Sequence, residues 1–585
     1  MTEIKKLWAY LKNYRLYFFA ALIFIILNVV FSMIPGYLNR RIIDDVIRGQ
    51  QLKLLFSLLT AYVIATLLRS IAIMLQRFFT EILSQNLLKD LKQALYEKLQ
   101  KLSFNFYNKN RTGELMSRMT GDMEAIRMLF ADGMIQFTRA IFYLIFVVLV
   151  LIQENIALTL VSICLSPLIG FFAYRLGVRI KPIFRQVRRQ YSDLNSTVQE
   201  NISGIRIVKA FHQQAFEMEK FSEENNSYFI KNYRAAQIWS KYFPIMEFLG
   251  GMSTVLLLFY GGRLVISGEI TLGVWMQFNS YLWMLIMPMR MIGPIVNMFS
   301  RTSASAERIF NILEKEPEIK NIAEPIKATK IAGKVEFKNV GLSYGDEVIL
   351  KNISFLAEPG QTIAIMGTTG SGKTSLVNLI PRFYEATSGE VLIDGRDNRS
   401  YDLYDLRQQI SVVMQEVFLF SETIANNIAY GRPEVGLEKI KSAAEISSAR
   451  DFIEEMEAGF EEVIGERGMG LSGGQKQRVS LARALVQESP ILIMDDATSA
   501  VDMETEHQIQ QALESRADKS TVFLIAHRIS SVRNADQILI LNDGEIIERG
   551  THAELIKQQG HYYKMFKEQY KEVMDEAEIA ERWVD

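Results

Sequence analysis

The stretch QTIAIMGTTGSGKTS, residues 361–375, decides the fold of the second half of this 585-residue chain. Its first part, QTIAIMG, is a continuous apolar run that suits a strand buried on both faces. The glycine-rich part, residues 367–374, matches the pattern G-x-x-x-x-G-K-[ST] in full. A buried strand, a glycine-rich loop and a helix in this order predict a loop that binds the phosphates of a nucleotide.

Each residue type in this loop has a chemical reason to be there. Glycines allow consecutive backbone N–H groups to surround phosphate oxygens without a side-chain clash. We expect the Lys373 ammonium to reach the β- and γ-phosphates and the Thr374 hydroxyl to ligate Mg²⁺. The residues predicted to bind the nucleotide here are Gly367, Thr368, Thr369, Gly370, Ser371, Gly372, Lys373, Thr374 and Ser375.

Two segments downstream carry further polar groups at fixed places. The run PILIMDD, residues 490–496, predicts a buried strand that ends in two carboxylates. We expect Asp495 to hold Mg²⁺ and Asp496 to activate water, because both tasks need rigid placement at a strand end. The segment LSGGQ, residues 471–475, opens a helical stretch, so its N–H groups suit a second anion.

The first half of the chain has a different character. Six apolar stretches each approach the ~20 residues that cross a bilayer as a helix. They cover residues 17–38, 54–76, 134–152, 156–174, 244–266 and 274–298. The connections between the second and third and between the fourth and fifth stretches have helical apolar spacing, so we expect these helices to extend into the cytosol. Interruptions near Gly113 and Gly204 predict short transverse elements that face a partner domain.

Basic residues suggest the orientation of these spans. They are concentrated in the N-terminal segment and in the two long connections, which places both chain ends in the cytosol. Arg40, Arg41 and Arg48 fall on the side predicted to be external, against this trend. The first 15 residues predict an amphipathic helix on the membrane surface, with Leu7, Tyr10 and Leu11 on one side. We therefore expect a multi-pass protein of the cytoplasmic membrane.

Charge and cysteine content exclude some other functions. The 65 basic and 66 acidic residues nearly cancel, which argues against a nucleic-acid partner. A single cysteine, Cys164, excludes an internal disulfide and a cysteine-based zinc cluster.

Residues 334–570 resemble an ATP-binding cassette (ABC) domain, because the motifs above follow that family's order. The resemblance implies ATP and Mg²⁺ as cofactors, with Tyr344 stacked on adenine. It makes Gln415 a sensor of Mg²⁺ and His527 a switch at the γ-phosphate, so that the implied catalytic residues are Asp496, His527 and Gln415. Metal contacts are implied for Thr374, Gln415 and Asp495. The residues implied to contact the other subunit are the signature Leu471, Ser472, Gly473, Gly474 and Gln475, and Ser499 and Asp502 of a crossing loop.

The whole chain resembles half of an ABC exporter of the multidrug type. The implied fold is an all-α membrane domain with six transmembrane helices extended into the cytosol, followed by an α/β P-loop NTPase domain. The second domain would contain an antiparallel β subdomain and an α-helical subdomain. The predicted divisions are a membrane domain with an N-terminal elbow helix and coupling regions, a linker, the cassette and an acidic tail, at residues 1–313 (coupling regions near 105–115 and 203–211), 314–333, 334–570 and 571–585.

One position departs from the family. Asp-Glu usually ends the second carboxylate strand, whereas Asp495 is followed here by Asp496. Because Asp is one methylene shorter than Glu, we expect slow hydrolysis of ATP at this chain's own P-loop. This asymmetry resembles heterodimeric bacterial multidrug exporters, whose other subunit has the catalytic Glu and an altered signature. The alternatives are a homodimer in which Asp496 acts through an extra water, and a nucleotide-gated regulator that does not pump.

The last span suggests a surface for apolar cargo, since flexible and polarisable side chains accept several shapes. Ordinary helix packing is the alternative interpretation of the same residues. Glu247 is a candidate contact for cationic drugs, although pairing with an arginine would also explain it. Drug, lipid and peptide cargo remain open, and membrane lipid is an expected partner. The candidate cavity residues are Glu247, Trp275, Phe278, Tyr281, Met284 and Met287.

Overall fold

The chain divides into two compact units, which are described separately. A computed structural model describes residues 2–499, 501–514 and 520–570. The first unit contains residues 1–101 and 110–315, and the second contains residues 102–109 and the chain from residue 316 onward. The predicted acidic tail, residues 571–585, lies outside the described residues.

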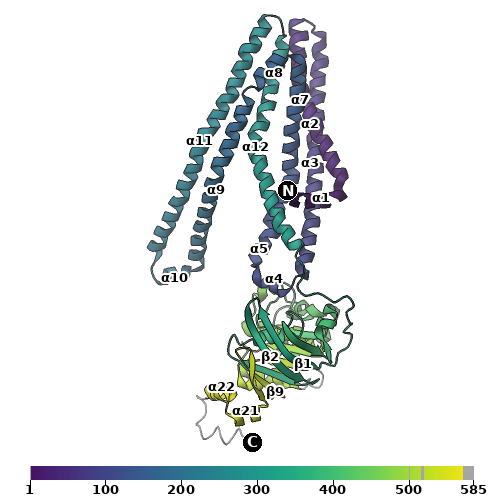
Figure 1. Ribbon diagram of the computed structural model, residues 1–585, viewed down its shortest axis with the longest axis vertical. Helices are drawn as coiled ribbons and strands as arrows, with labels where there is room; N and C mark the ends of the chain where they lie inside the picture. Colours follow the sequence, from purple (N-terminus) through teal and green to yellow (C-terminus); the bar gives the residue numbers. More distant parts are fainter. Residues whose placement is uncertain (1, 500, 515–519, 571–585) are drawn as a thin grey trace. The chain divides into compact units, whose positions relative to one another are not determined.

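The first unit is entirely helical. Its α-helices are α1 (Thr2–Leu11), α2 (Arg15–Arg41), α3 (Lys53–Lys101), α5 (Thr112–Ser117), α6 (Met123–Met128), α7 (Met134–Glu154), α8 (Ile156–Ile163), α9 (Ser166–Ser203), α10 (Ile205–Ala210), α11 (Gln214–Ile266) and α12 (Leu272–Leu313). Two π-helical turns, Arg118–Asp122 and Leu129–Gly133, join α5, α6 and α7 into one continuous rod. Helices α9 and α11 run side by side to the short α10 at their tip (Figure 1).

Six helical segments are long and apolar enough to cross a membrane, which confirms the predicted spans. They are Lys5–Arg48, Lys53–Lys101, Thr112–Glu154, Ile156–Ser203, Gln214–Ile266 and Leu272–Leu313. A helix suits this environment because all of its backbone polar groups bond within the segment. The segments are 42 to 53 residues long, about twice what a bilayer needs. The helices therefore extend beyond the membrane, as predicted.

Local contacts explain two features of this unit. Helix α1 buries Leu7 and Leu11, and the Tyr10 ring lies 6.3 Å from the ring of Phe310 in α12. The basic residues that opposed the predicted orientation are partly neutralised. Arg40 pairs with Glu154 at the end of α7, and Arg41 donates to Asp45 at 2.6 Å.

The second unit is built on two sheets. Its strands are β1 (Val335–Tyr344), β2 (Glu347–Ala357), β3 (Thr362–Gly367), β4 (Ser388–Ile393), β5 (Arg396–Asp397), β6 (Ile410–Val413), β7 (Ile491–Asp495), β8 (Thr521–Ile525), β9 (Gln537–Asn542) and β10 (Glu545–Gly550). An antiparallel sheet has the order β2-β1-β4-β5, and a mixed sheet has the order β10-β9-β3-β8-β7-β6. Strands β7 and β8 are buried along their whole length, as expected for a sheet covered on both faces.

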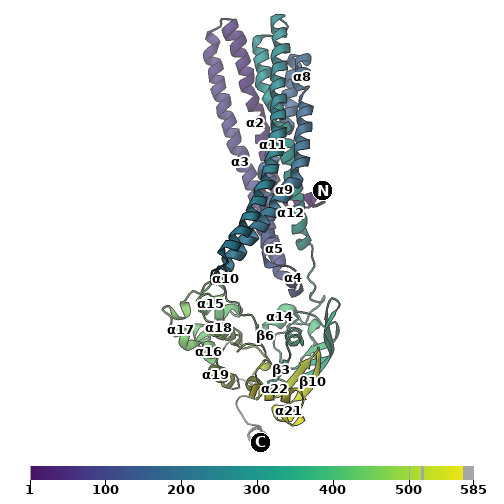
Figure 2. The same ribbon diagram turned by 90° about the vertical axis from the view of Figure 1, so that its left-hand side faces the viewer.

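The mixed sheet separates two hydrophobic cores. On one face, Phe337 and Phe355 of the antiparallel sheet stack at 4.6 Å, and Phe355 lies 6.4 Å from Phe523 of β8. The other face packs against helices, of which α15–α18 form a group (Figure 2). The helices of this unit are α4 (Phe104–Lys109), α13 (Lys373–Val377), α14 (Leu403–Gln408), α15 (Ile424–Ile428), α16 (Leu437–Ile446), α17 (Arg450–Glu454), α18 (Gly473–Leu485), α19 (Met503–Glu514), α20 (Ile529–Val532), α21 (His552–Gln558) and α22 (His561–Tyr570). The predicted fold class, with its β and helical subdomains, is confirmed.

Candidate nucleotide-binding site

One edge of the mixed sheet collects the predicted site residues. Strands β3, β8, β7 and β6 are parallel neighbours, so their carboxyl ends meet at the same edge. The glycine-rich loop follows β3, His527 follows β8, the two aspartates end β7, and Gln415 follows β6. Open α/β sheets bind ligands at this edge, because loops that differ in sequence converge there.

Backbone geometry explains two of the loop glycines. Gly367 has φ +149°, and a Cβ atom there would lie 2.0 Å from the Leu541 carbonyl oxygen. Gly372 has φ +98° and would place a Cβ atom 2.8 Å from the Leu350 side chain. Because glycine has no side chain, it fits at both places. The loop can then turn tightly and keep its N–H groups available for phosphate oxygens.

The buried Lys373 side chain is the cation of this loop. Its Nζ donates to the carbonyl oxygens of Gly367 and Thr368, both at 2.9 Å. Burial lowers the pKa of Lys373, and the charges of Asp495 and Asp496 act against that shift. Burial removes water from the Lys373 ammonium, and the negative charge of a phosphate group would compensate for that loss. The loop is therefore suited to an anion.

Thr374 and Asp495 come together as a candidate Mg²⁺ site. The Thr374 hydroxyl hydrogen-bonds the Asp495 carboxylate, which is only 6% exposed at the end of β7. Burial raises the pKa of Asp495, and the neighbouring Asp496 adds to the rise. A buried carboxylate beside a hydroxyl fits Mg²⁺, which uses few protein ligands together with phosphate oxygens and waters.

The third predicted metal contact is placed differently. Gln415 is exposed just after β6. In residues 2–499, 501–514 and 520–570, no group of three or more His, Cys, Asp or Glu side chains is arranged to hold a metal.

Tyr344 ends β1 beside the first turn that follows the loop. Its hydroxyl donates to Ser375 Oγ at 3.3 Å, and 36% of the residue is exposed. Burial of the other part raises the pKa of Tyr344, so the ring stays neutral. A half-exposed neutral ring next to the phosphate loop is suited to stacking on a flat base.

The LSGGQ segment begins helix α18 with a complete capping box. The backbone N–H of Gln475 donates to the Ser472 hydroxyl at 3.3 Å, and the Gln475 side chain accepts from the Ser472 N–H at 2.8 Å. Leu471 is buried, whereas Ser472 and Gly473 are exposed. The 13-residue helix thus presents its positive end and an exposed hydroxyl to solvent.

Asp496 is held by its backbone rather than by its side chain. Its N–H donates to the Ile525 carbonyl at 3.0 Å, and its own carbonyl accepts from Ser499 Oγ at 3.1 Å. Asp502 caps α19 by accepting from the Thr505 N–H at 2.9 Å. Ala500, between them, lies outside the part of the chain that the structure describes.

Comparison with known families decides what this arrangement is. Residues 18–289 match the model of the ABC transporter transmembrane region, and residues 350–499 match that of the ABC transporter domain. The chain belongs to the ABC transporters. Such transporters bind ATP together with Mg²⁺, and this one is an ATP-hydrolysing exporter with its six spans and cassette on one chain.

Several relatives of this ABC exporter cover it nearly end to end. It is 40% identical to the uncharacterized ABC transporter ATP-binding protein YknU of Bacillus subtilis, over 98% of both chains. It is 37% identical to an ATP-dependent lipid A-core flippase of Syntrophus aciditrophicus, over 92% of this chain and 89% of the relative. The putative multidrug export protein YgaD of Bacillus subtilis is 33% identical over 97% and 99% of the two chains.

A solved structure gives the same result for the exporter's fold. A bacterial Atm1-family ABC exporter with ATP bound superposes with a TM-score of 0.81 at 25% identity. The match covers 96% of this chain and 99% of the other. Together with the six spans, this makes the protein a multi-pass membrane protein.

Two polar residues of the exporter's site were missed by the sequence analysis. Glu506 is 3% exposed and accepts from Thr498 Oγ1 at 3.0 Å and from Arg528 at 2.8 Å. Gln477 of α18 donates to Ser499 Oγ at 3.0 Å, which ties the signature helix to the crossing loop. The only available signal was a buried glutamate in an amphipathic helix. Such a glutamate does not indicate which residues it is hydrogen-bonded to.

Hydrogen bonds to helix α22 hold the backbone at His527. Gln569 of α22 donates to the His527 carbonyl at 2.6 Å and accepts from the Ile529 N–H at 2.9 Å. The His527 side chain is exposed at the carboxyl edge of the sheet. It is therefore free to meet a phosphate that enters from solvent.

The candidate cargo residues of α12 have mixed surroundings. Phe278 and Tyr281 are 0% and 1% exposed, and the Tyr281 hydroxyl donates to the Met33 carbonyl at 2.6 Å. The structure thus places these two in the helix core, in agreement with the packing alternative. Trp275 is also tied to a backbone carbonyl, at 3.1 Å, whereas Met287 is 55% exposed and Met284 half-buried.

Glu247 has the arginine partner that the sequence left open. Arg290 Nη1 donates to its carboxylate at 2.6 Å, and the Glu247 side chain is still 43% exposed. The pair neutralises both charges within the spans while leaving one side of the carboxylate accessible.

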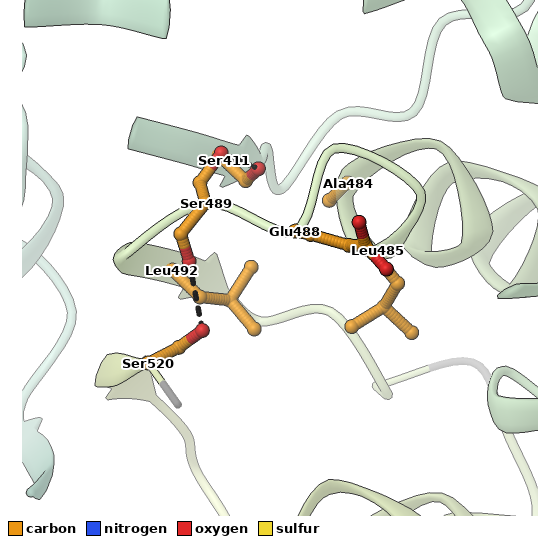
Figure 3. Close-up of a pocket in the computed structure, with 7 residues that line it drawn as sticks. All are labelled: Ser411, Ala484, Leu485, Glu488, Ser489, Leu492 and Ser520. Carbon is orange, nitrogen blue, oxygen red and sulfur yellow. Dashed lines mark hydrogen bonds between the residues drawn. The ribbon is translucent and has the colours of Figure 1, made fainter. Parts of the chain in front are cut away.

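A small cavity lies away from the nucleotide edge. It measures about 270 Å³ and is bordered by the start of β6, the start of β7 and the residue before β8 (Figure 3). Ser411 donates to Ser489 Oγ at 2.8 Å, and Ser520 donates to the Ser489 carbonyl at 2.7 Å. These two hydrogen bonds lie at the amino ends of the parallel strands, opposite the edge where the ATP site forms.

Replacement of Asp495 by Asn should separate fold stability from Mg²⁺ binding. A carboxyl whose pKa is raised by folding stabilises the fold while protonated, and this contribution is lost as the pH rises through the folded-state pKa. At pH 7, Asp495→Asn should therefore raise the melting temperature of the nucleotide-free exporter. The same change should remove the extra stabilisation, about 5–10 °C at saturating ligand, that Mg²⁺ adds to ATP.

Thermal unfolding in detergent, with ATP and with or without Mg²⁺, measures both effects. Asp451→Asn, at an exposed position of α17, is the matched control and should change neither. For the unmodified chain, the Mg²⁺ effect should weaken as the pH falls, because protons compete for Asp495. A Mg²⁺ effect that survives in Asp495→Asn would contradict the assignment.

Proposed function

We propose that this chain is one half of a heterodimer that exports amphipathic drugs or other apolar small molecules by alternating access. The observation that carries the asymmetry is Asp496, which stands where the family has Glu. The intact signature from Leu471 to Gln475 supports a chain that completes the partner's catalytic site while its own site is impaired. The partner would carry the catalytic Glu and an altered signature.

Half-transporters of this family dimerise, and the helix α10 supports the need for a second cassette. Helix α4 buries Phe106 within the second unit, whereas α10 buries none of its side chains. Ile207 is 65% exposed, and Phe211, directly after α10, is 72% exposed. Apolar side chains at the tip of a helix pair are suited to a partner surface. We infer that α10 docks onto the partner's cassette and that α4 docks onto this chain's own.

The same proposal assigns the site residues and the orientation. Both chain ends lie in the cytosol, because the cassette must meet cytosolic ATP. Tyr344 stacks on adenine, Lys373 contacts the phosphates, and Thr374 and Asp495 hold Mg²⁺ with Gln415. His527 contacts the γ-phosphate, and Ser499 and Asp502 face the partner. ATP binding closes the two cassettes, and the coupling helices transmit that closure to the spans.

Transport into inverted membrane vesicles tests the function. An amphipathic cationic dye should accumulate against its gradient when ATP and Mg²⁺ are added, and a non-hydrolysable ATP analogue should not support it. Accumulation would exclude a nucleotide-gated regulator, which could only let the dye equilibrate. ATP hydrolysis without any uphill movement of dye or lipid would contradict the export of apolar molecules.

An anionic lipid is a second candidate cargo, favoured by one observation. Arg139 of α7 is half-buried within the membrane-spanning segment Thr112–Glu154. Its Nε is buried and has no hydrogen-bond partner in the described part of the chain. Three lipid A-core flippases, 37%, 34% and 33% identical, are among the relatives. In the vesicle assay, Arg139→Gln should reduce movement of an anionic lipid and leave dye accumulation unchanged if lipid is the cargo.

A further inference from the structure

Tyr384 lies between the predicted adenine position and helix α4. Its ring centroid is 5.0 Å from that of Tyr344, with the two planes tilted by 56°. On its other side, the Asn108 amide of α4 donates to the Tyr384 hydroxyl at 2.7 Å. All three residues belong to the second unit, which includes residues 102–109.

The residue before it anchors α4 in a different way. The Phe383 ring lies 4.6 Å from the Phe104 ring of α4 and 5.1 Å from the Arg407 guanidinium. Burial lowers the pKa of Arg407 to about 10, and its Nε donates to the Pro381 carbonyl at 3.0 Å. Phe383 thus packs between α4 and a fixed cation. This contact holds the helix, and the Phe104 ring also lies 6.5 Å from the Tyr384 ring.

The Tyr344 hydroxyl is hydrogen-bonded beside the phosphate loop. It donates to Ser375, the residue after Thr374. A continuous series of contacts therefore runs from the start of α13 through Tyr344 and Tyr384 to Asn108. The series consists of the Tyr344–Ser375 hydrogen bond, the Tyr344–Tyr384 ring contact and the Asn108–Tyr384 hydrogen bond.

We propose that Tyr384 transmits the presence of a purine base on Tyr344 to helix α4. It is a positioning residue, because it touches neither phosphate nor reacting atoms. A base stacked on one face of Tyr344 restricts that ring, and the tilted Tyr384 ring must follow. Since its hydroxyl is bonded to Asn108, the restriction reaches α4. This inference rests on the proposed stacking of adenine on Tyr344.

The proposal distinguishes the base from the phosphates. Inorganic triphosphate offers Lys373 a chain of three phosphates, as ATP does, but leaves Tyr344 without a stacking partner. ATP should therefore change the surroundings of α4, and triphosphate should not. A ligand moves an equilibrium only through contacts that differ between the two states, and here the differing contact is the base.

A fluorescent label on α4 tests this in the full-length purified complex. Lys109→Cys, at the exposed end of α4, takes the label, and Cys164→Ser removes the exposed native thiol. The Cys164→Ser protein with Lys109 unchanged is the blank, because any label that it takes is attached elsewhere. ATP with Mg²⁺ should change the fluorescence, whereas triphosphate with Mg²⁺ should leave it nearly unchanged. Equal responses to the two ligands would overturn the proposal.

Two variants, each of which removes one partner of the Asn108–Tyr384 hydrogen bond, locate the relay. Tyr384→Phe and Asn108→Ala should each reduce the ATP response at least fivefold, and the double variant should reduce it no further. ATP affinity, measured by displacement of a fluorescent ATP analogue, should stay within twofold, which a general packing defect would not allow. Tyr404→Phe, at a 70% exposed tyrosine, is the matched control. A full response in Tyr384→Phe would overturn the relay.

Tyr344→Leu separates this inference from the proposed function. It should weaken ATP binding and abolish the response of the label. Unchanged ATP affinity would overturn the assignment of adenine to Tyr344. Weakened affinity together with a full response in Tyr384→Phe would leave that assignment intact and overturn only the role of Tyr384.

Discussion

Asp496→Glu should accelerate ATP hydrolysis at this chain's own P-loop by about 10- to 100-fold. The added methylene extends the carboxylate by an ångström or more, and a general base must lie within about 2.6–3.2 Å of its proton. The backbone of Asp496 is bonded on both sides, to Ile525 and to Ser499, so the added length goes into reach rather than into movement of the strand end.

The longer side chain also makes the backbone conformation at position 496 less favourable, but this cost is smaller than the gain in rate. Asp496 has φ +52°, in the left-handed region, where Asp is tolerated better than Glu. The left-handed conformation costs roughly 1–2 kcal/mol per ordinary residue. A 100-fold gain in rate corresponds to about 2.7 kcal/mol at the transition state. The variant should therefore melt slightly lower and turn over faster.

The measurement needs the other ATP site to be silent. Ser472→Asp achieves this in the proposed heterodimer, because the signature of this chain serves the partner's ATP. Turnover of the Ser472→Asp complex is then compared with and without Asp496→Glu. Asp496→Asn, which keeps the shape and removes the base, should lower the residual rate. No gain with Asp496→Glu, at unchanged ATP affinity, would contradict the argument from reach.

Sequence alone predicted the architecture well because its signals are local and repeated. Six apolar runs of membrane length leave a helix as the only way to satisfy their backbone, and all six spans are confirmed. The glycine-rich loop was equally clear, since Gly367 and Gly372 stand where a Cβ atom would clash. Parallel strands then bring Asp495 and His527 to the same edge without further information.

Contacts between distant side chains could not be predicted in the same way. The aromatic residues of α12 had the composition of a cargo surface, yet Phe278 and Tyr281 lie in the helix core. Composition does not say which face of a helix meets its neighbours. Glu506 and Tyr384 were missed because their partners, Arg528 and Asn108, are 22 and 276 residues away in sequence.

Lys373→Met and Ser472→Asp should have very different effects if the dimer is asymmetric. Lys373→Met keeps the aliphatic stem but removes the charge that meets the phosphates, so ATP binding at this chain's P-loop should weaken about 10- to 100-fold. In the proposed heterodimer that site hydrolyses little ATP, so total turnover should fall only severalfold. Ser472→Asp places a negative charge against the partner's ATP, and total turnover should fall at least about 100-fold.

The choice of Asp at position 472 separates catalysis from folding. Ser472 caps α18, and Asp caps helices as well as Ser does, so the helix should remain intact. Thr551→Asp makes the corresponding change at the cap of α21, which has the same capping box and belongs to no nucleotide contact. That control should retain full turnover and the melting temperature of the unmodified complex.

In a homodimer the two variants must behave alike. Each ATP would then lie between a Lys373 and a Ser472 of identical chains, so that either change would damage both sites and lower turnover at least about 100-fold. The ratio of the two turnover rates is therefore near one for a homodimer and large for the proposed heterodimer. The intact mass of the purified complex checks the same point independently, because the asymmetric arrangement requires a second, different chain at equal ratio. If the complex contained two identical chains and the two variants still differed in turnover, no partner could supply a catalytic Glu. Asp496 would then have to be the working base.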